Sequence, residues 1–174
     1  MTAGRAPLTV PLGPGGRRIA GAQAVVVDRG GRVLLQFRPW PLGWEPPGGH
    51  VAPGETADAT VVRETAEETG CGIALERLTG IYTFTGWRRS TDAVYRARLT
   101  SGAPRRTREA WRIGWFDPAR LPQTLFPWYR DRIQDAIAPG PGVAQRRQPV
   151  TSGDILRHGL ALGLALGPGR RRGA

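Results

Sequence analysis

The chain has 174 residues and a net charge of +11, and all 25 of its basic residues are arginine. A chain of this length can bury one core, and the absence of lysine excludes a lysine Schiff base and the lysine of a phosphate-binding P-loop. The single cysteine, Cys71, excludes an internal disulfide and a cysteine-based zinc cluster, and it fits a reducing compartment. The charge indicates either anionic partners or a general replacement of lysine by arginine.

The N-terminal third is predicted to pass from an arm into a hairpin and then a loop. Residues 1–20, rich in glycine, proline and arginine, predict a flexible arm. They contain no apolar segment of signal-peptide length, so we expect a cytoplasmic protein. Residues 22–27 and 33–37 are β-prone runs, and the glycine-bearing turn at 28–32 predicts a hairpin between them. Five prolines and three glycines in residues 39–53 predict an irregular loop.

A helix is predicted over residues 57–69. Thr56 or Glu55 can cap its start, Asp58 suits the positive end of the helix dipole, and Gly70 stands at the usual stop position. The remaining predicted elements are strands at 73–84, 93–99 and 111–116 and a second helix at 126–138, with Pro127 in its first turn. We therefore assign residues 21–138 to one domain.

Residues 139–174 differ in composition from the domain and are predicted to be a tail rich in proline, glycine and arginine. The tail carries six arginines and one aspartate. Its apolar segment at 155–166 is shorter than the roughly 20 residues that cross a bilayer. We expect a short docking helix there and no membrane partner, with contact at a membrane surface as the alternative.

Four of the seven glutamates lie between Gly49 and Cys71. Glu64, Glu67 and Glu68 are spaced i, i+3 and i+4, so they share one face of the predicted helix. Three like charges on one face destabilise a helix unless water or a cation screens them. Hard divalent cations prefer oxygen ligands, and magnesium is often shared between carboxylates and substrate phosphates. The pattern favours a phosphate enzyme, with a solvated acidic helix face as the alternative.

The surrounding residues favour the enzyme. Residues 46–50, Pro-Pro-Gly-Gly-His, contain glycines that let backbone groups approach a ligand closely. Arg63, beside Glu64, can orient a carboxylate or contact phosphate.

Residues 49–71, GHVAPGETADATVVRETAEETGC, resemble the signature box of the Nudix hydrolase family, G-x5-E-x7-R-E-U-x-E-E-x-G-U, where U is a bulky aliphatic residue. All seven fixed positions are matched, by Gly49, Glu55, Arg63, Glu64, Glu67, Glu68 and Gly70. Thr65 and Cys71 stand where the family prefers aliphatic residues, and both are small enough to pack against a sheet. The resemblance extends over about residues 20–138.

The resemblance implies an α/β fold, an α/β/α sandwich around a mixed sheet with a loop-helix-loop catalytic motif. It implies Mg²⁺, or Mn²⁺, held by Glu64, Glu67 and Glu68. The Gly49 carbonyl and Glu55 would be additional ligands. It also implies that Arg63 holds a glutamate in place, and the general base would be Glu67 or Glu109.

The implied reaction is hydrolysis of a diphosphate linkage in a nucleoside diphosphate joined to another group, such as a nucleoside triphosphate or a nucleotide sugar. Two other functions stay open. One is a regulatory module that binds a nucleotide without turnover, and the other is an RNA-end pyrophosphohydrolase whose basic tail follows the phosphate backbone. Homodimerisation is common in the family and is an expectation here.

Overall fold

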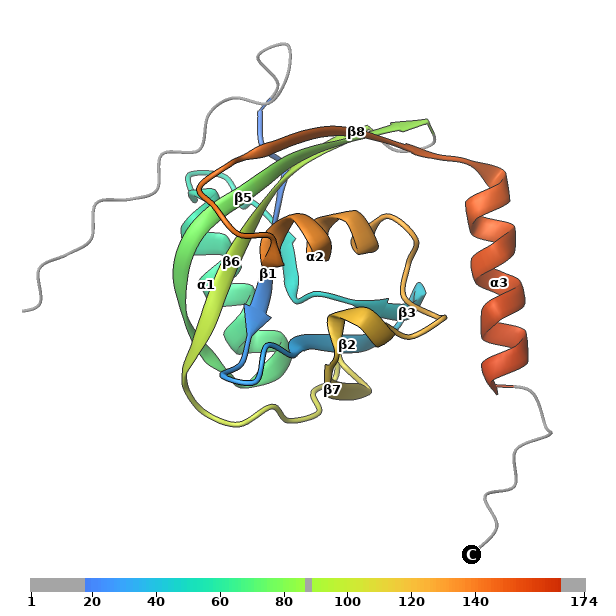
Figure 1. Cartoon of the computed structure of the whole chain (residues 1–174), viewed down its shortest axis with the longest axis horizontal. Helices are drawn as coiled ribbons and strands as arrows, with labels where there is room; N and C mark the ends of the chain where they lie inside the picture. Colours follow the sequence, from blue (N-terminus) through green and yellow to red (C-terminus); the bar gives the residue numbers. More distant parts are fainter. Residues whose placement is uncertain (1–17, 87–88, 167–174) are drawn as a thin grey trace, which may run out of the picture.

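The computed structural model describes residues 18–86 and 89–166, in which a mixed sheet lies between helices (Figure 1). Six strands follow the order β3-β2-β1-β6-β5-β8, while β4 pairs with β1 and β7 pairs with β2. The strands are β1 (Gly21–Val27), β2 (Val33–Pro39), β3 (Leu42–Glu45), β4 (Gly48–His50), β5 (Gly72–Gly86), β6 (Ser90–Ser101), β7 (Arg112–Phe116) and β8 (Ala144–Val150). The predicted α/β sandwich around a mixed sheet is confirmed. The predicted arm lies outside the described residues except for residues 18–20.

The predicted hairpin is present as antiparallel β1 and β2. Asp28 fixes its turn, because one carboxylate oxygen accepts from the backbone nitrogens of Gly30 (2.9 Å) and Arg32 (2.8 Å). Gly31 has φ of 77°, which glycine adopts without strain. On its other side β1 runs parallel to β6. β1 therefore lies between β2 and β6, in the interior of the sheet.

Helix α1 (Ala57–Thr69) has the predicted bounds. The Thr56 hydroxyl caps it by accepting from the Ala59 nitrogen, and Gly70 ends it in the left-handed conformation at φ 72°. Ala57 and Val61 pack into one core cluster with apolar residues of β1, β5 and β6. This packing fixes which face of α1 lies against the sheet and which faces solvent.

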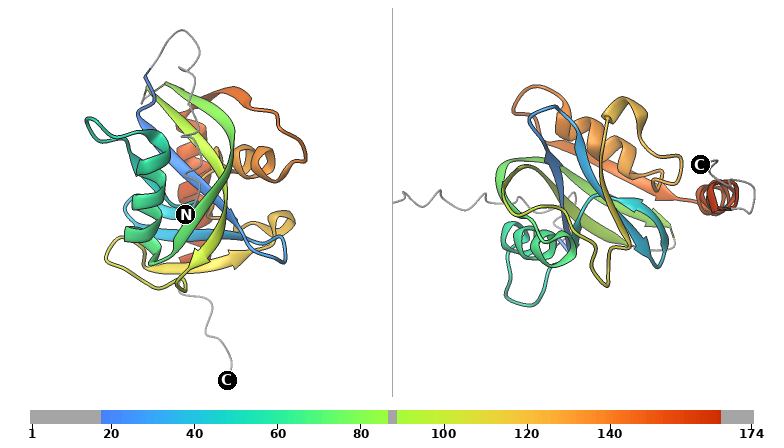
Figure 2. Two further views of the ribbon diagram at one scale, coloured as in Figure 1. Left: turned by 90° about the vertical axis from the view of Figure 1, so that its left-hand side faces the viewer. Right: turned by 90° about the horizontal axis from the view of Figure 1, so that it is seen from below.

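Helix α2 (Tyr129–Ile137) covers the opposite face of the sheet (Figure 2). Ile133 is fully buried in a second core cluster with residues of β1, β2, β5 and β6. The predicted start at residue 126 is wrong by three residues. The chain before α2 instead pairs with β3, since the Phe126 nitrogen donates to the Trp44 carbonyl and the Trp44 nitrogen donates to the Thr124 carbonyl. Pro127 therefore precedes the helix.

The loop predicted over residues 39–53 is wrong in part, because it contains the two short strands β3 and β4. β3 pairs with β2 and β4 pairs with β1, both antiparallel. Each strand contains glycine and is too short for apolar alternation to mark it in the sequence. β4 nevertheless places Gly48 and Gly49 beside β1, next to α1.

The described part of residues 139–174 contains the expected helix. It also contains a strand, β8, that the sequence did not predict. β8 pairs in parallel with β5 at the edge of the sheet, with only Gln148 buried. Such a polar edge strand lacks the alternation that marks most strands. Helix α3 (Ser152–Leu166) then lies to the side of the sandwich (Figure 1). The division of the chain at residue 138 stays a prediction.

Helix α3 is attached through His158. The imidazole stacks on Phe126 with ring centroids 4.2 Å apart, and its Nε2 lies 2.6 Å from the Leu42 carbonyl. Gly43 makes room for this contact, since a Cβ at residue 43 would come within 3 Å of both rings. No helix in the described part of the chain is long and apolar enough to cross a bilayer.

Candidate active site

Arg63 gathers three of the predicted site glutamates. Its Nε and Nη2 donate to the two carboxylate oxygens of Glu55, each at 2.9 Å. Its Nη1 donates to Glu64 at 2.9 Å and to Glu67 at 3.0 Å. The hydrogen bonds from Arg63 lower the pKa of Glu55 to about 2. The guanidinium thus ties the loop before α1 to the acidic face of α1.

Gly49 lies directly against the Glu64 carboxylate. A Cβ at this position would overlap the carboxylate carbon and both of its oxygens. The register Ala22↔Gly49 between β1 and β4 holds the glycine there. Two of the predicted ligands, from a strand and a helix, therefore lie side by side, and the approach requires glycine.

Glu68 lies at the buried edge of the acidic face of α1, whereas Glu67 lies at its exposed edge. The Glu68 side chain is 1% exposed, against 58% for Glu67, and it accepts a hydrogen bond from the Gly48 nitrogen at 2.8 Å. Burial raises the pKa of Glu68 to about 8, and the nearby Glu45 carboxylate adds to the rise. The nearest arginine contact is to Arg38, at 3.9 Å. The acidic face thus joins an exposed carboxylate to a buried one.

Glu109, the other candidate base, is on an exposed loop between β6 and β7. The Thr107 hydroxyl anchors the loop by donating to the Glu68 carbonyl at 2.9 Å and accepting from the Glu109 nitrogen at 3.3 Å. Among the hydrogen bonds of the described residues, none joins the Glu109 carboxylate to a box glutamate. The structure therefore brings together the box residues and leaves Glu109 at the end of α1.

Within residues 18–86 and 89–166, no three carboxylate, histidine or cysteine groups converge as a ready metal site. The Arg63 Nη1 occupies the space between Glu64 and Glu67. The donor set nevertheless fits a hard divalent cation, because it consists of carboxylates beside a glycine backbone. The raised pKa of Glu68 also marks a buried carboxylate that is short of positive charge, which a divalent cation would supply.

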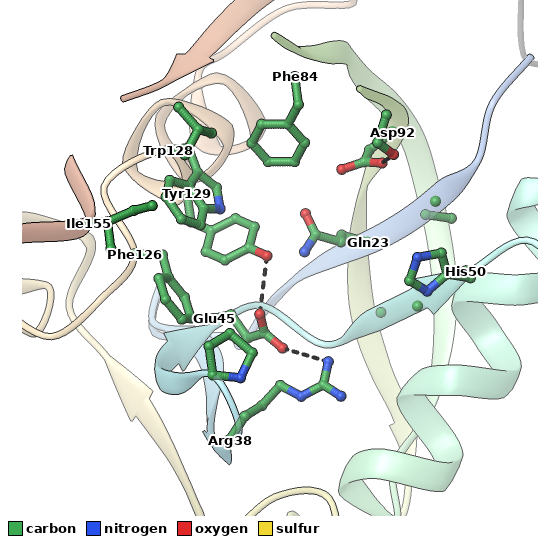
Figure 3. Close-up of a pocket in the computed structure, with 17 residues that line it drawn as sticks. Gln23, Arg38, Glu45, His50, Phe84, Asp92, Phe126, Trp128, Tyr129 and Ile155 are labelled. Carbon is green, nitrogen blue, oxygen red and sulfur yellow. Dashed lines mark hydrogen bonds and ion pairs between the residues drawn. The ribbon is translucent and has the colours of Figure 1, made fainter. Parts of the chain in front are cut away.

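Gly48 and Gly49, which contact this cluster, also line a pocket of about 300 Å³. Figure 3 shows the side chains around it. This volume is at the lower end of the range for small-molecule sites. One wall is mainly aromatic and apolar, formed by Pro41, Phe84, Phe126, Trp128, Tyr129 and Ile155. The polar side chains that line it are Gln23, Arg38, Glu45, His50, Ser90 and Asp92. The pocket can enclose a flat ring while leaving a polar group at the glutamates.

Glu45, in β3, was missed by the sequence analysis. Its carboxylate accepts from the Arg38 Nη1 at 3.2 Å and from the Tyr129 hydroxyl at 3.1 Å (Figure 3). Burial raises the pKa of Glu45. The available signal was a charged residue between an aromatic residue and two prolines, and only the pairing of β2 with β3 shows that it faces a pocket.

A mixed sheet between helices, with a glutamate-rich helix packed on a glycine strand, defines a Nudix-type fold and site. Residues 17–136 match the family model described as the NUDIX domain, which is more than half of the chain. The chain belongs to the Nudix family, and it is a Nudix-type diphosphatase. Members of the family typically use a divalent metal.

Several relatives are similar in sequence. A "MutT-like protein" of Streptomyces ambofaciens is 34% identical over 113 residues, which are 65% of this chain and 73% of the relative. A "Putative 8-oxo-dGTP diphosphatase" of Bacillus subtilis is 31% identical over 115 residues, or 66% and 77% of the two chains.

Solved structures share the fold. A MutT NUDIX hydrolase from Burkholderia pseudomallei has a TM-score of 0.59 and 32% identity, covering 68% of this chain and 98% of that one. An ADP-ribose pyrophosphatase from Streptococcus suis has a TM-score of 0.62, covers 74% and 97% of the two chains, and at 19% identity supports the fold alone.

Proposed function

We propose that this enzyme hydrolyses a nucleoside triphosphate to a nucleoside monophosphate and pyrophosphate, and that 8-oxo-dGTP is the first substrate to test. The observation that carries the proposal is the position of the aromatic pocket directly beside the box glutamates, separated from them only by Gly48 and Gly49. A base in the pocket would leave its phosphates at the acidic face. The name of the relative from Bacillus subtilis, a putative 8-oxo-dGTP diphosphatase, supports the same class of substrate.

Glu64, Glu67 and Glu68, with the Gly49 carbonyl, would hold Mg²⁺ or Mn²⁺, and Glu55 would be an outer ligand. When bound, the cation would neutralise phosphate charge and lower the pKa of coordinated water. Tight seating of Glu64 against Gly49 and of Glu68 against the Gly48 nitrogen fixes two of these carboxylates before substrate arrives.

Other side chains of the enzyme would orient the carboxylates, bind phosphate and act as the general base. Arg63 keeps Glu55 and Glu64 oriented through its forked hydrogen bonds. Arg38, with a side chain 32% exposed, borders the pocket and can donate to a phosphate oxygen. Glu67 is the most exposed of the three box glutamates on α1 and is our proposed base, with Glu109 as the second candidate.

In the proposed step a water oxygen bonds to one phosphorus while the bridging phosphorus–oxygen bond breaks. The base takes the water proton, and the phosphate group on the far side of the broken bond leaves with the electron pair. Hydrolysis in ¹⁸O-labelled water shows which phosphorus is attacked, because the label appears only in the product that contains that phosphorus.

The test is turnover of a substrate panel with Mg²⁺ or Mn²⁺, following phosphate and pyrophosphate release. The panel holds 8-oxo-dGTP, the ordinary nucleoside triphosphates, nucleotide sugars, dinucleoside polyphosphates and capped RNA. Glu67→Gln should lose most of the activity, and Glu76→Gln, at a β5 residue paired with Arg96, is the matched control that should keep it. Chelation of the metal by EDTA should abolish turnover.

The results of this panel distinguish the proposed hydrolase from the regulatory module and the RNA-end enzyme. Turnover of a nucleoside triphosphate that Glu67→Gln loses and Glu76→Gln retains supports the proposal. Binding of a nucleotide without turnover under either metal supports the regulatory module instead. Turnover confined to capped RNA, with steep salt dependence that disappears on deleting residues 139–174, supports the RNA-end enzyme.

A further inference from the structure

Arg132, on α2, is a fully buried cation directly behind the pocket. Its Nη1 donates to Asp92 at 3.0 Å and to the side-chain oxygen of Gln23. Its Nε and Nη2 donate to the side-chain oxygen of Gln148 at 3.1 and 3.0 Å. The guanidinium carbon also lies 4.7 Å from the centroid of the Phe84 ring. Every polar partner of this arginine must therefore present an oxygen, because a guanidinium has donors and no acceptor.

This constraint fixes the direction of the Gln23 amide. Since the oxygen faces Arg132, the nitrogen must point away from it, toward the pocket that Gln23 lines with Glu45 and Tyr129 (Figure 3). Gln148 is fixed in the same way, but its nitrogen donates to the Trp128 carbonyl at 2.8 Å. No hydrogen bond to another described residue uses the Gln23 nitrogen, so it remains a donor for a ligand.

Asp92 provides a hydrogen-bond acceptor beside the Gln23 donor. One oxygen accepts from Arg132 and the other accepts from the Ser90 hydroxyl at 2.8 Å, and each oxygen keeps a further lone pair. Gly21 allows the carboxylate to sit there, because a Cβ at residue 21 would lie 2.7 Å from an Asp92 oxygen. Since the same Arg132 nitrogen contacts both side chains, a fixed donor and a fixed acceptor lie close together in the pocket.

We infer that Arg132 is a positioning residue for specificity, which orients Gln23 and Asp92 to select a ring that presents a carbonyl oxygen next to a ring N–H. A 6-keto purine or a 4-keto pyrimidine has this edge. A 6-amino purine or a 4-amino pyrimidine places an amino group against the Gln23 nitrogen and an unprotonated ring nitrogen against Asp92, so it loses both hydrogen bonds. This inference deepens the proposed function and rests on it for the identity of the ring.

The test compares matched nucleotides in wild type and in Gln23→Glu. The ratio of kcat/KM for GTP over ATP, and for UTP over CTP, is measured with Mg²⁺, and the ratio of dissociation constants for the same nucleotides is measured with Ca²⁺ to limit turnover. Gln23→Glu keeps the oxygen for Arg132 and replaces the donor by an acceptor. The keto-over-amino ratio should therefore fall about tenfold or more, the usual cost of a mispaired buried polar group.

Gln134→Glu is the matched control, since it makes the same chemical change at an exposed position on α2 and should leave the ratio unchanged. Arg132→Lys should also lower the ratio, because a single ammonium cannot orient three partners. If Arg132→Lys fails to fold, Gln23→Glu alone decides. An unchanged ratio in Gln23→Glu, or a wild type that prefers the amino rings, overturns the inference.

The binding measurement distinguishes failure of the proposed hydrolysis from failure of the specificity inference. If wild type turns over no nucleotide but binds the keto rings more tightly, and Gln23→Glu removes that preference, the specificity inference stands and the proposed hydrolysis fails. If wild type hydrolyses nucleotides with a ratio that Gln23→Glu does not move, the hydrolysis stands and the inference fails.

Discussion

Glu68→Gln should stabilise the metal-free protein at high pH while abolishing its activity. The buried carboxylate has a pKa of about 8, above its ordinary value of 4.5, so the folded state binds this proton more tightly than the unfolded state. The stability of wild type should therefore fall as the pH rises from about 4.5 to about 8. Gln resembles the protonated acid and can still accept from the Gly48 nitrogen, so the variant lacks this loss.

The expected difference in unfolding free energy between Glu68→Gln and wild type follows from the pKa. It should be below about 1 kcal/mol at pH 5 and reach about 4 kcal/mol in favour of the variant at pH 8. Carboxylates with a lowered pKa, such as Glu55 and Asp135, are mostly ionised in both states between pH 5 and pH 8 and contribute little to the trend.

The assay is urea unfolding in EDTA at pH 5, 6.5 and 8, for wild type, Glu68→Gln and Glu67→Gln. Glu67 is 58% exposed, and its variant should follow the pH dependence of wild type although it also loses activity. A Glu68→Gln advantage that is the same at pH 5 and pH 8 would refute the reasoning, because it could not come from a buried proton.

The other predictions concern two glycines that side chains approach closely, Gly49 and Gly43, and the hydrogen bonds of the Arg63 guanidinium. Gly49→Ala should lower kcat more than tenfold because its Cβ would overlap the Glu64 carboxylate, whereas Gly142→Ala, in open space, should be neutral in the same steady-state assay. Arg63→Lys should lower kcat about 10- to 100-fold, since one ammonium cannot hold Glu55 and Glu64 together, and a kcat within twofold of wild type would contradict this role. Gly43→Ala should displace α3 by crowding His158, seen as faster proteolysis within residues 151–166 and a severalfold rise in KM, with Gly142→Ala again as the control.

The amino-acid sequence by itself determined the family, the helix over residues 57–69 and the residues of its acidic face. These are local properties, because capping at Thr56, the stop at Gly70 and the i, i+3, i+4 spacing all act within a few turns of chain. The two glycines before the helix were also readable as a site of close backbone approach.

Only the tertiary structure decided what surrounds that helix. Neighbouring Glu67 and Glu68 have the same chemistry, and the packing of α1 on the sheet alone makes one exposed and the other buried. Strand β8 is polar and pairs with β5, more than fifty residues earlier in the chain, so no local pattern marks it. Gln23 and Asp92 line the pocket and Arg132 lies behind them, and the three come from separate elements. Long-range pairing and helix packing, and not sequence spacing, bring their charges and hydrogen-bonding groups together.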